Sequence, residues 1–399
     1  MVKSPETSSV PERVYPSMVR LLARSSGGRD QVPAAQDWRD IEHWLLEAGG
    51  RVPTLHALFE AFCWRLVAAN VPLHRASLHV GTLHPQLLGF AWNWSLADGF
   101  CDEVQVSEEA LQDPAFLRSP LAVVFRTGEE LVLDPRDDAT VAQYGIMADL
   151  RKASFTEYVA IPLGAGSYHN VATVATCHPD GFTSAQHAVL RSLLRLLALH
   201  VERHIALRIS RNVVATYLGA DAGKAVLDGV IKRGKGSRIA AVIWVSDLRG
   251  FTDLSDRLAP DDMLLILNAY FSALVEAITD NGGDVLKFVG DGMLAVFPLE
   301  RSYAQANAAT AALAAALAAE EAVAELGIHP PDELAAIMGW APLLSGIGLH
   351  VGDVFFGNVG APNRLDFTVI GSAVNTASRV EGLTKPLARP IIMTAPVAS

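Results

Sequence analysis

Two carboxylates stand where apolar strands are expected to end. Asp247 follows IAAVIWVS, a continuous apolar and β-branched run that predicts a buried strand. Asp291 lies in DVLKFVGDGMLAVF, where two short apolar segments flank Gly290 and Gly292, a pattern that predicts two strands joined by a tight turn. A lone Asp at a strand end is often a turn residue. Two in one α/β unit indicate a candidate site for a divalent cation, because hard cations prefer carboxylate oxygens.

The strand before that turn carries Lys287. Side chains alternate along a strand, which places Lys287 and Asp291 on one side of the pleat. Val285 and Val289 are expected on the same side. Four residues of strand separate Lys287 from Asp291 by roughly 13 Å. The two side chains therefore cannot pair, and each needs another partner.

A third group of polar residues follows the strand-like segment DFTVI. Gly371 ends that segment, and Asn375 and Arg379 lie four residues apart on one face of the helix expected after it. An amide and a guanidinium at a strand–helix junction suit ribose and phosphate oxygens. Arg379 taken alone would indicate a surface salt bridge.

The elements around these residues alternate between strands and helices. Apolar residues at helical spacing predict a helix over 260–281, and an Ala-rich helix is expected to end near Leu326. The strand-like GIGLHVGDVFFGNVG precedes the last motif. This alternation predicts an α/β unit from residue 238 onward.

The N-terminal half has a different pattern. Helical spacing over 38–69, broken at Gly49, Gly50 and Pro53, predicts two helices, and a Leu-rich helix is expected over 184–209. Between them, an antiparallel sheet is predicted from the segments ASLHVGTL, LLGFAWNW, LAVVFRTG, YVAIPLG and NVATVATC.

Length and composition predict two domains. A chain of 399 residues exceeds the size of one core, and 50% hydrophobic with 19% charged residues is globular composition. The expected division is a disordered tail over 1–35, an N-terminal domain over 36–210, a helical linker over 211–237 and a C-terminal domain over 238–399. The net charge of −11 argues against nucleic acid as a partner, since phosphate binding draws on clustered Lys and Arg.

The cysteines and the N-terminal residues indicate the cellular compartment of the protein. The three cysteines lack CxxC spacing, which indicates neither a zinc site nor a disulfide framework. The first residues lack the apolar segment of a signal peptide, and the Ala-rich run near residues 304–319 is too weakly apolar for a membrane span. We expect a cytoplasmic protein without a membrane span.

Helices, five or six strands and a closing helix, in that order, resemble a GAF-like α+β sensor domain. The resemblance implies a ligand or partner that the sequence does not identify. Some aromatic residues and histidines could line a ligand pocket or ligate haem, although packing on the sheet faces is the favoured interpretation. These residues are His74, His79, His84, Trp92 and Trp94.

Four motifs in the C-terminal half, VSDLRGFT, LKFVGDGMLAVF, GLHVGDVFFGNVG and DFTVIGSAVNTASRVE, resemble the catalytic domain of class III adenylate and guanylate cyclases in order and spacing. The resemblance covers about residues 237–399. It implies a ferredoxin-like α/β (α+β) sandwich that is active as a homodimer, with nucleotide bound between the subunits.

The resemblance also assigns metal ligands. Asp247 and Asp291 match the two metal-binding aspartates of the family, and Leu248 matches a position whose backbone carbonyl contributes. Two Mg²⁺ or Mn²⁺ ions per site are implied. One ion would lower the pKa of the ribose 3′-hydroxyl, and both would neutralise the triphosphate of the substrate.

Four further positions match residues that contact the nucleotide. Lys287 and Thr368 match the purine-reading pair, and Asn375 and Arg379 match the pair that orients the ribose and stabilises the transition state. Lys287 can donate to adenine N1 while the Thr368 hydroxyl accepts from the exocyclic amine, whereas guanylate cyclases of the family carry a Glu and a Cys or a similar pair. The resemblance therefore implies conversion of ATP to 3′,5′-cyclic AMP and pyrophosphate, regulated by the N-terminal domain.

One family feature is missing. A further Lys that binds the β- and γ-phosphates usually lies near the C-terminal end of the domain, and this sequence ends at IIMTAPVAS before such a segment. We expect the C-terminal end of the catalytic domain to be missing. The alternatives are a guanylate cyclase and a catalytically silent nucleotide-binding signalling protein.

Overall fold

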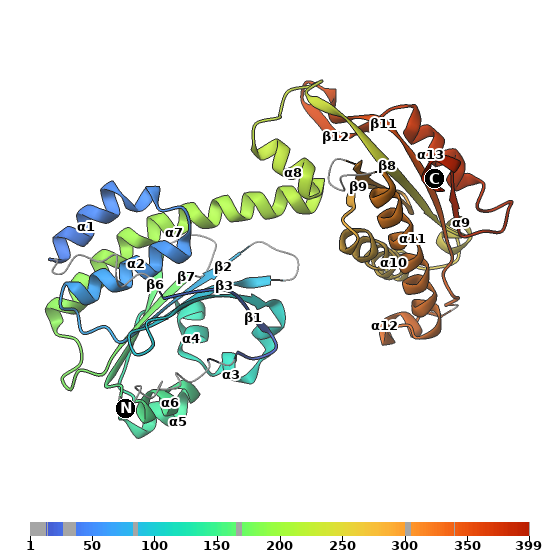
Figure 1. Cartoon of the computed structure of the whole chain (residues 1–399). Helices are drawn as coiled ribbons and strands as arrows, with labels where there is room; N and C mark the ends of the chain where they lie inside the picture. The colour runs from blue at the N-terminus through green and yellow to red at the C-terminus, as the bar shows by residue number, and fades with distance from the viewer. Residues whose placement is uncertain are drawn as a thin grey trace, which may run out of the picture. The chain divides into compact units, whose positions relative to one another are not determined.

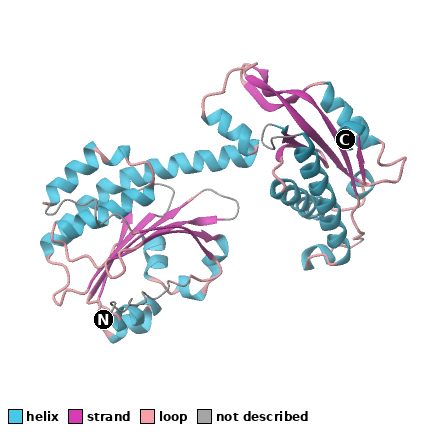
Figure 2. Ribbon diagram, viewed as in Figure 1, coloured by secondary structure: helices cyan, strands magenta, loops and turns pink. Residues whose placement is uncertain are grey.

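The computed structural model describes residues 13, 15–26, 37–82, 87–164, 170–299, 305–338 and 340–398. The chain forms two compact units, Met1–Val213 and Val214–Ser399. Figures 1 and 2 show both units, with a sheet and helices in each.

The N-terminal unit is built on one sheet whose neighbouring strands are all antiparallel. The strands are β1 (Val19–Ser25), β2 (Arg75–Gly81), β3 (Leu87–Ser95), β4 (Cys101–Ser107), β5 (Leu131–Leu133), β6 (Glu157–Leu163) and β7 (Asn170–Thr176). They lie in the order β1-β4-β3-β2-β7-β6-β5. The mixed helix and strand content agrees with an α+β unit, and the GAF-like resemblance remains a prediction.

Helices cover both faces of this sheet (Figure 1). On one face are α1 (Trp38–Glu47), η2 (Gly49–Arg51), α2 (Leu55–Ala68) and α7 (Ser184–Leu218), which pack a large apolar core against Leu78, Trp92 and Trp94. On the other face are η3 (Glu108–Gln112), α3 (Pro114–Leu117), α4 (Pro120–Thr127), α5 (Asp138–Gln143) and α6 (Gly145–Lys152). The two helices predicted over 38–69 are confirmed as α1 and α2.

One predicted strand of this sheet is wrong. LAVVFRTG belongs to α4, which begins after Ser119, whose hydroxyl accepts a hydrogen bond from the Ala122 backbone N–H at 3.2 Å. Pro120 occupies the first turn, and Gly128 ends the helix with φ of +69°. These are helix-boundary signals, and they outweigh the β-branched residues between them.

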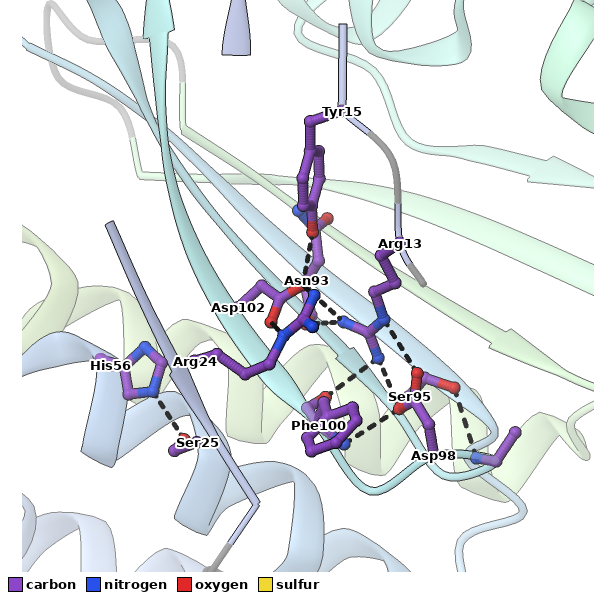
Figure 3. Close-up of polar contacts among 11 residues, drawn as sticks. Arg13, Tyr15, Arg24, Ser25, His56, Asn93, Ser95, Asp98, Phe100 and Asp102 are labelled. Carbon is purple, nitrogen blue, oxygen red and sulfur yellow. Dashed lines mark hydrogen bonds and ion pairs between the residues drawn. The ribbon is translucent and has the colours of Figure 1, made fainter. Parts of the chain in front are cut away.

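The predicted disordered tail is also wrong in part, because Val19–Ser25 form β1 along β4. Buried Asp102 anchors this segment: the Tyr15 hydroxyl donates to it at 2.7 Å, Arg24 at 2.7 Å and Arg13 at 3.2 Å (Figure 3). Arg13 also pairs with Asp98 at 2.6 Å. Burial would raise the pKa of Asp102, but the hydrogen bonds from Arg24 and Tyr15 and the charge of Arg13 lower it overall.

The C-terminal unit has a six-stranded sheet. Its strands are β8 (Gly236–Leu248), β9 (Asp284–Val289), β10 (Gly292–Pro298), β11 (Ser345–Ala361), β12 (Arg364–Ile370) and β13 (Ile391–Met393). The order is β12-β11-β8-β10-β9, and β13 pairs with β11. The central β11-β8-β10-β9 arrangement is antiparallel, with one long helix, α10 (Pro260–Asp280), between β8 and β9 and another, α11 (Gln305–Ile328), between β10 and β11. This is the βαββαβ pattern of a ferredoxin-like sheet.

Helices pack on both faces of this sheet as well. They are α8 (Ala220–Leu227), α9 (Phe251–Ser255), α10 (Pro260–Asp280), α11 (Gln305–Ile328), α12 (Asp332–Ala335), α13 (Ser372–Gly382) and α14 (Ala395–Ala398). The core under α10 and α11 contains Trp244 and Phe297, and the core under α13 contains Ile243 and Leu294. The predicted linker over 211–237 contains the end of α7, all of α8 and the first residues of β8.

Within the described ranges, α10 is the one helix long and apolar enough to cross a membrane by length and composition, with a mean hydropathy of 1.4. Ile266, Tyr270 and Leu274 on this helix are buried in the core that α10 shares with α11. Core helices of soluble proteins have the same length and composition, so this finding gives no positive sign of a membrane.

Candidate active site

The two carboxylates predicted to share a site lie at the ends of neighbouring strands. Asp247 is the penultimate residue of β8, and the predicted tight turn is confirmed: Gly290, with φ of +65°, and Asp291 join β9 to β10. Because β8 pairs with β10 through Ser246 and Met293, this turn brings Asp291 beside Asp247. A Cβ on Gly292 would lie 2.7 Å from the Ser246 carbonyl oxygen, so the close approach requires glycine.

The proximity of the two carboxylates has an electrostatic consequence. The pKa of Asp247 is raised to about 6, first by burial and then by the charge of Asp291 and a hydrogen bond with it. Glu381 adds to the effect, and Arg249 opposes it. Two carboxylates that face one another repel when both are ionised, and a cation between them would relieve the repulsion.

Arg249 and Glu381 form an ion pair next to this site that sequence reasoning missed. The Arg249 guanidinium donates to Glu381 Oε1 at 2.9 Å, and both side chains are largely buried. Arg249 follows β8 directly, while Glu381 lies in the last turn of α13. Arg249 lies two residues after Asp247, and Glu381 lies two residues after Arg379. This closeness to predicted site residues was the only hint in the sequence, and no local pattern links Arg249 with Glu381.

The donor set fits a hard divalent cation. Asp247 and Asp291 supply carboxylate oxygens, and Leu248, whose side chain is in the core, ends β8 directly after Asp247. Among the residues described, no group of three or more His, Cys, Asp or Glu side chains gathers into a metal site. A cation here would therefore need further oxygens from backbone, water or a phosphate-bearing ligand.

The structure corrects the predicted faces of β9. Lys287 is paired with Leu294, but Val285 is paired with Ala295, so Leu286 forms a bulge. Opposed residues share a face, which places Lys287 on the α13 side with Leu294. Val285 lies on the α10 side with Ala295. The prediction that Val285 and Lys287 share one side is wrong, because the bulge turns the side chain of Lys287 to the other face.

That orientation gives Lys287 a partner. Its ammonium donates to Asp366 Oδ2 on β12 at 2.7 Å. Asp366 lies two residues before Thr368 and on the same face of β12. Thr368 is 6% exposed, and its buried hydroxyl has no hydrogen-bond partner among the residues that the structure describes. Lys287 therefore lies close to the strand of Thr368, as the predicted purine pair requires, and Asp366 was missed.

Asn375 and Arg379 lie on α13, whose opposite face buries Ala373 and Ala377 against the sheet. Both polar side chains are exposed, and neither forms a hydrogen bond or ion pair with another described residue. The predicted site residues thus form three groups: the carboxylate pair, the Lys287 group and the α13 pair. No hydrogen bond or ion pair within the described residues joins one group to another.

The predicted group of N-terminal histidines and tryptophans does not form one site. Trp92 and Trp94 are buried in the core under α2 and α7, whereas His79 points to the opposite face of the sheet, toward α3 and α4. His74 Nδ1 is 3.0 Å from the Pro72 carbonyl oxygen. His84 lies outside the described residues.

Comparisons with known proteins agree with the C-terminal geometry. Residues 237–397 match the family model for the adenylate and guanylate cyclase catalytic domain. The chain is 36% identical over 167 residues to an adenylate cyclase of Anabaena cylindrica, an alignment that covers 41% of this chain and 31% of that protein. It is 32% identical over 152 residues to the terminal-differentiation-specific adenylate cyclase of Dictyostelium discoideum, covering 38% of this chain and 7% of that protein. The chain thus spans less than a third of the length of these relatives.

A solved structure of an adenylyl cyclase from P. aeruginosa is 29% identical and covers 41% of this chain and 80% of its own, with a TM-score of 0.36. The family match contains the carboxylate pair, the Lys287 group and the α13 pair. The part of the chain that is similar to the adenylate and guanylate cyclase catalytic domain, residues 237–397, therefore includes every residue of the candidate active site.

Proposed function

We propose that the C-terminal unit converts ATP to 3′,5′-cyclic AMP and pyrophosphate at a site shared by two copies of the chain. The observation that carries the proposal is the Asp247–Asp291 carboxylate pair at two neighbouring strand ends, within residues that match the cyclase domain. The similarity to adenylate cyclases of two organisms supports it. Regulation by the N-terminal unit belongs to the same proposal.

In this proposal Asp247, Asp291 and the backbone carbonyl of Leu248 hold Mg²⁺ or Mn²⁺, two ions per site. Bound there, the cation lowers the pKa of the ribose 3′-hydroxyl and neutralises charge on the triphosphate. The 3′-oxygen forms a bond to the α-phosphorus while the bond from that phosphorus to the pyrophosphate oxygen breaks. The hydroxyl proton leaves to solvent, and pyrophosphate departs.

Arg379 donates to the α-phosphoryl oxygens, on which charge grows in the transition state, and the Asn375 amide holds the ribose. An electrostatic contact of this kind is worth about 3 to 4 kcal/mol in comparable sites. The exposure of both side chains on α13, without a partner among the described residues, supports their availability to a nucleotide.

Base recognition falls to Lys287 and Thr368. Lys287 donates to adenine N1, and the buried, unpartnered Thr368 hydroxyl accepts from the exocyclic amine. Asp366 acts as a positioning residue, because its ion pair holds the Lys287 ammonium on the side of β12. Guanine would present an N1–H donor to the ammonium and leave polar groups unsatisfied, a penalty that discriminates strongly.

Exposed apolar residues support a second copy as the partner. Phe288 and Val289 on β9 are 51% and 61% exposed, and Leu264 on α10 is 56% exposed. Phe288 packs on Phe271 of α10 with ring centroids 4.4 Å apart, so these apolar groups belong to one surface. Large apolar side chains gathered beside a candidate site are typical of a protein interface.

A paired assay tests the proposal. Wild-type chain with Mn²⁺ or Mg²⁺ should release cyclic AMP and pyrophosphate from ATP, and Asp291→Ala should release neither. Turnover of GTP equal to or better than ATP would overturn the base assignment in favour of a guanylate cyclase. ATP binding without product in the wild type would instead indicate a silent nucleotide-binding protein.

Complementation tests the shared site. If Asp291 acts with Asp247 of its own chain, and Lys287 reads the purine at the other site of the dimer, mixed Asp291→Ala and Lys287→Ala chains should recover part of the ATP cyclase activity. Each variant mixed with itself is the control. No recovery despite verified mixing would contradict the shared geometry.

A further inference from the structure

The N-terminal unit contains a cavity of about 700 Å³ on the sheet face that α3 and α4 cover. Strands β2, β3 and β4 form its floor, and η3, α3 and α4 form one wall. This volume lies within the range of about 300 to 1,000 Å³ that is typical of small-molecule sites. The large apolar core of the unit lies on the opposite face of the sheet, so the cavity is not a packing defect of that core.

The mostly apolar floor of the cavity carries two uncharged polar side chains, His79 and Asn93. His79 Nε2 is 2.9 Å from Ser77 Oγ, which in turn is 2.6 Å from Thr173 Oγ1. The other ring nitrogen of His79 and the side-chain amide of Asn93 have no hydrogen-bond partner among the described residues. Burial, followed by the charge of Arg75, lowers the pKa of His79 to about 4, so the imidazole is neutral at physiological pH.

The walls are apolar and aromatic. Phe116 of α3 and Phe125 of α4 line the cavity with ring centroids 6.1 Å apart. Two of its lining residues carry a formal charge. Asp113 accepts a hydrogen bond from the Ala115 backbone N–H at 2.8 Å, and Arg126 is exposed in the last turn of α4. An ion bound inside would lose its water shell without a charged partner, which is costly.

One side of the cavity is closed by the N-terminal strap, residues 15–25, through Tyr15 and Met18. Asp102 holds this strap by hydrogen bonds from Tyr15 and Arg24 (Figure 3). Tyr15 thus places its ring at the cavity while its hydroxyl is bound elsewhere. The wall is therefore already formed without a ligand, which lowers the ordering cost of binding.

We propose that this cavity binds an uncharged, planar heteroaromatic small molecule, whose polar edge meets His79 and Asn93 and whose ring faces pack between Phe116, Phe125 and the strap. A neutral imidazole and an amide offer both a donor and an acceptor, the pattern that selects a heteroaromatic edge over a hydrocarbon. The aromatic walls supply the π-faces for stacking. This site is separate from the proposed cyclase chemistry and does not depend on it.

A fluorescence titration of the full chain with prodan, an uncharged planar naphthalene ketone, tests the site. Wild type should bind one prodan per chain, and quinoline-3-carboxamide, an uncharged heteroaromatic, should displace it at least ten-fold better than quinoline-3-carboxylate, which has the same ring system with a charge. Ala122→Trp, which fills the cavity from α4, should abolish binding. Val132→Trp, on β5 outside the cavity and 52% exposed, is the matched control and should bind as wild type does.

His79→Phe and Asn93→Leu provide readouts that do not depend on filling the cavity. Wild type should prefer quinoline-3-carboxamide to naphthalene, which has the same bicyclic shape without polar groups. Both variants should keep prodan binding within about ten-fold and lose that preference. Equal binding by wild type and Ala122→Trp would overturn the site. A preference for the carboxylate, or a Soret band in the purified protein, would overturn the ligand class in favour of an anion or a haem.

Discussion

Asp102 and Asp247 are carboxylates in the sheets of the two units, and their surroundings are opposite in charge. Asp102 is fully buried, and two arginines and a tyrosine hydroxyl lower its pKa. Asp247 is half-buried, and its pKa is raised first by burial and then by the charges of Asp291 and Glu381. The charge of Asp102 is neutralised by side chains of the same chain, whereas the charge of Asp247 would be neutralised by a bound cation. A buried compensated carboxylate indicates a structural role, whereas an uncompensated one at a strand end indicates a ligand.

Removing the compensated carboxylate should have the largest effect. Asp102→Ala leaves Arg13 and Arg24 without their buried partner, which should lower the free energy of unfolding of the N-terminal unit by about 3 to 5 kcal/mol. Urea unfolding followed by tryptophan fluorescence measures it. Asp134→Ala, which breaks an exposed pair with Arg136, is the control and should leave the transition close to that of wild type. Equal shifts in both variants would contradict the structural role of Asp102.

The uncompensated carboxylate should show the reverse pattern. Asp247→Asn should lower ATP cyclase activity at least about 10³-fold, or about 4 kcal/mol of transition-state stabilisation. The same change removes the repulsion with Asp291, so the melting temperature in metal-free buffer at pH 8 should not fall. An activity loss accompanied by a large fall in melting temperature would place Asp247 in the same class as Asp102.

Asp284 is a third carboxylate, buried like Asp102, and it extends the comparison of Asp102 with Asp247. No Lys, Arg or His among the described residues forms an ion pair with it. Burial raises its pKa to about 6, although the Ala220 backbone N–H at the start of α8 donates to it. The folded state therefore binds a proton that the unfolded state releases near pH 4, and stability falls as pH rises from about 4 to 6. Asp284→Asn should be more stable than wild type by about 1 to 3 kcal/mol at pH 8.

The difference between Asp284→Asn and wild type should vanish below pH 4, where the carboxyl is protonated in both states. Thermal unfolding at pH 3.5 and pH 8 measures this. Asp256→Asn, at an exposed position after α9, is the control and should show no such pH-dependent gain. A gain at pH 8 that persists at pH 3.5 would contradict the charge as its cause.

Sequence patterns predicted the elements that local periodicity determines. The turn at Gly290 and Asp291, α10, α11 and the carboxylates at two strand ends follow from alternation, helical spacing and glycine positions within one segment. The grouping of Asp247 with Asp291 followed from their places at two strand ends of one α/β unit, and the motif resemblance added the roles of Lys287, Thr368, Asn375 and Arg379. The sequence prediction of a strand at 121–128 gave more weight to the β-branched residues than to the helix-boundary signals at Ser119, Pro120 and Gly128, which determine the observed helix.

Features that depend on the exact pairing of one strand with another could not be predicted. The bulge at Leu286 arises from the register of β9 against β10, and it decides which face Lys287 occupies. The strand β1 forms because Asp102, far along the chain, anchors Tyr15 and Arg24. Asp366 has no sequence signal of its own, since its role depends on that bulge.

Asp366 gives the smallest expected effect and the finest test of the comparison. Its pair with Lys287 is compensated like Asp102, but the two side chains are 57% and 34% exposed, so the pair should add little stability. If it positions Lys287 for the purine, Asp366→Asn should lower kcat/KM for ATP about ten-fold through KM, which corresponds to about 1.4 kcal/mol, and should narrow the preference for ATP over GTP. The melting temperature should stay close to that of wild type. If Asp366→Asn kept the wild-type preference for ATP over GTP while Lys287→Ala lost activity with ATP, Lys287 would reach the base without its ion pair to Asp366.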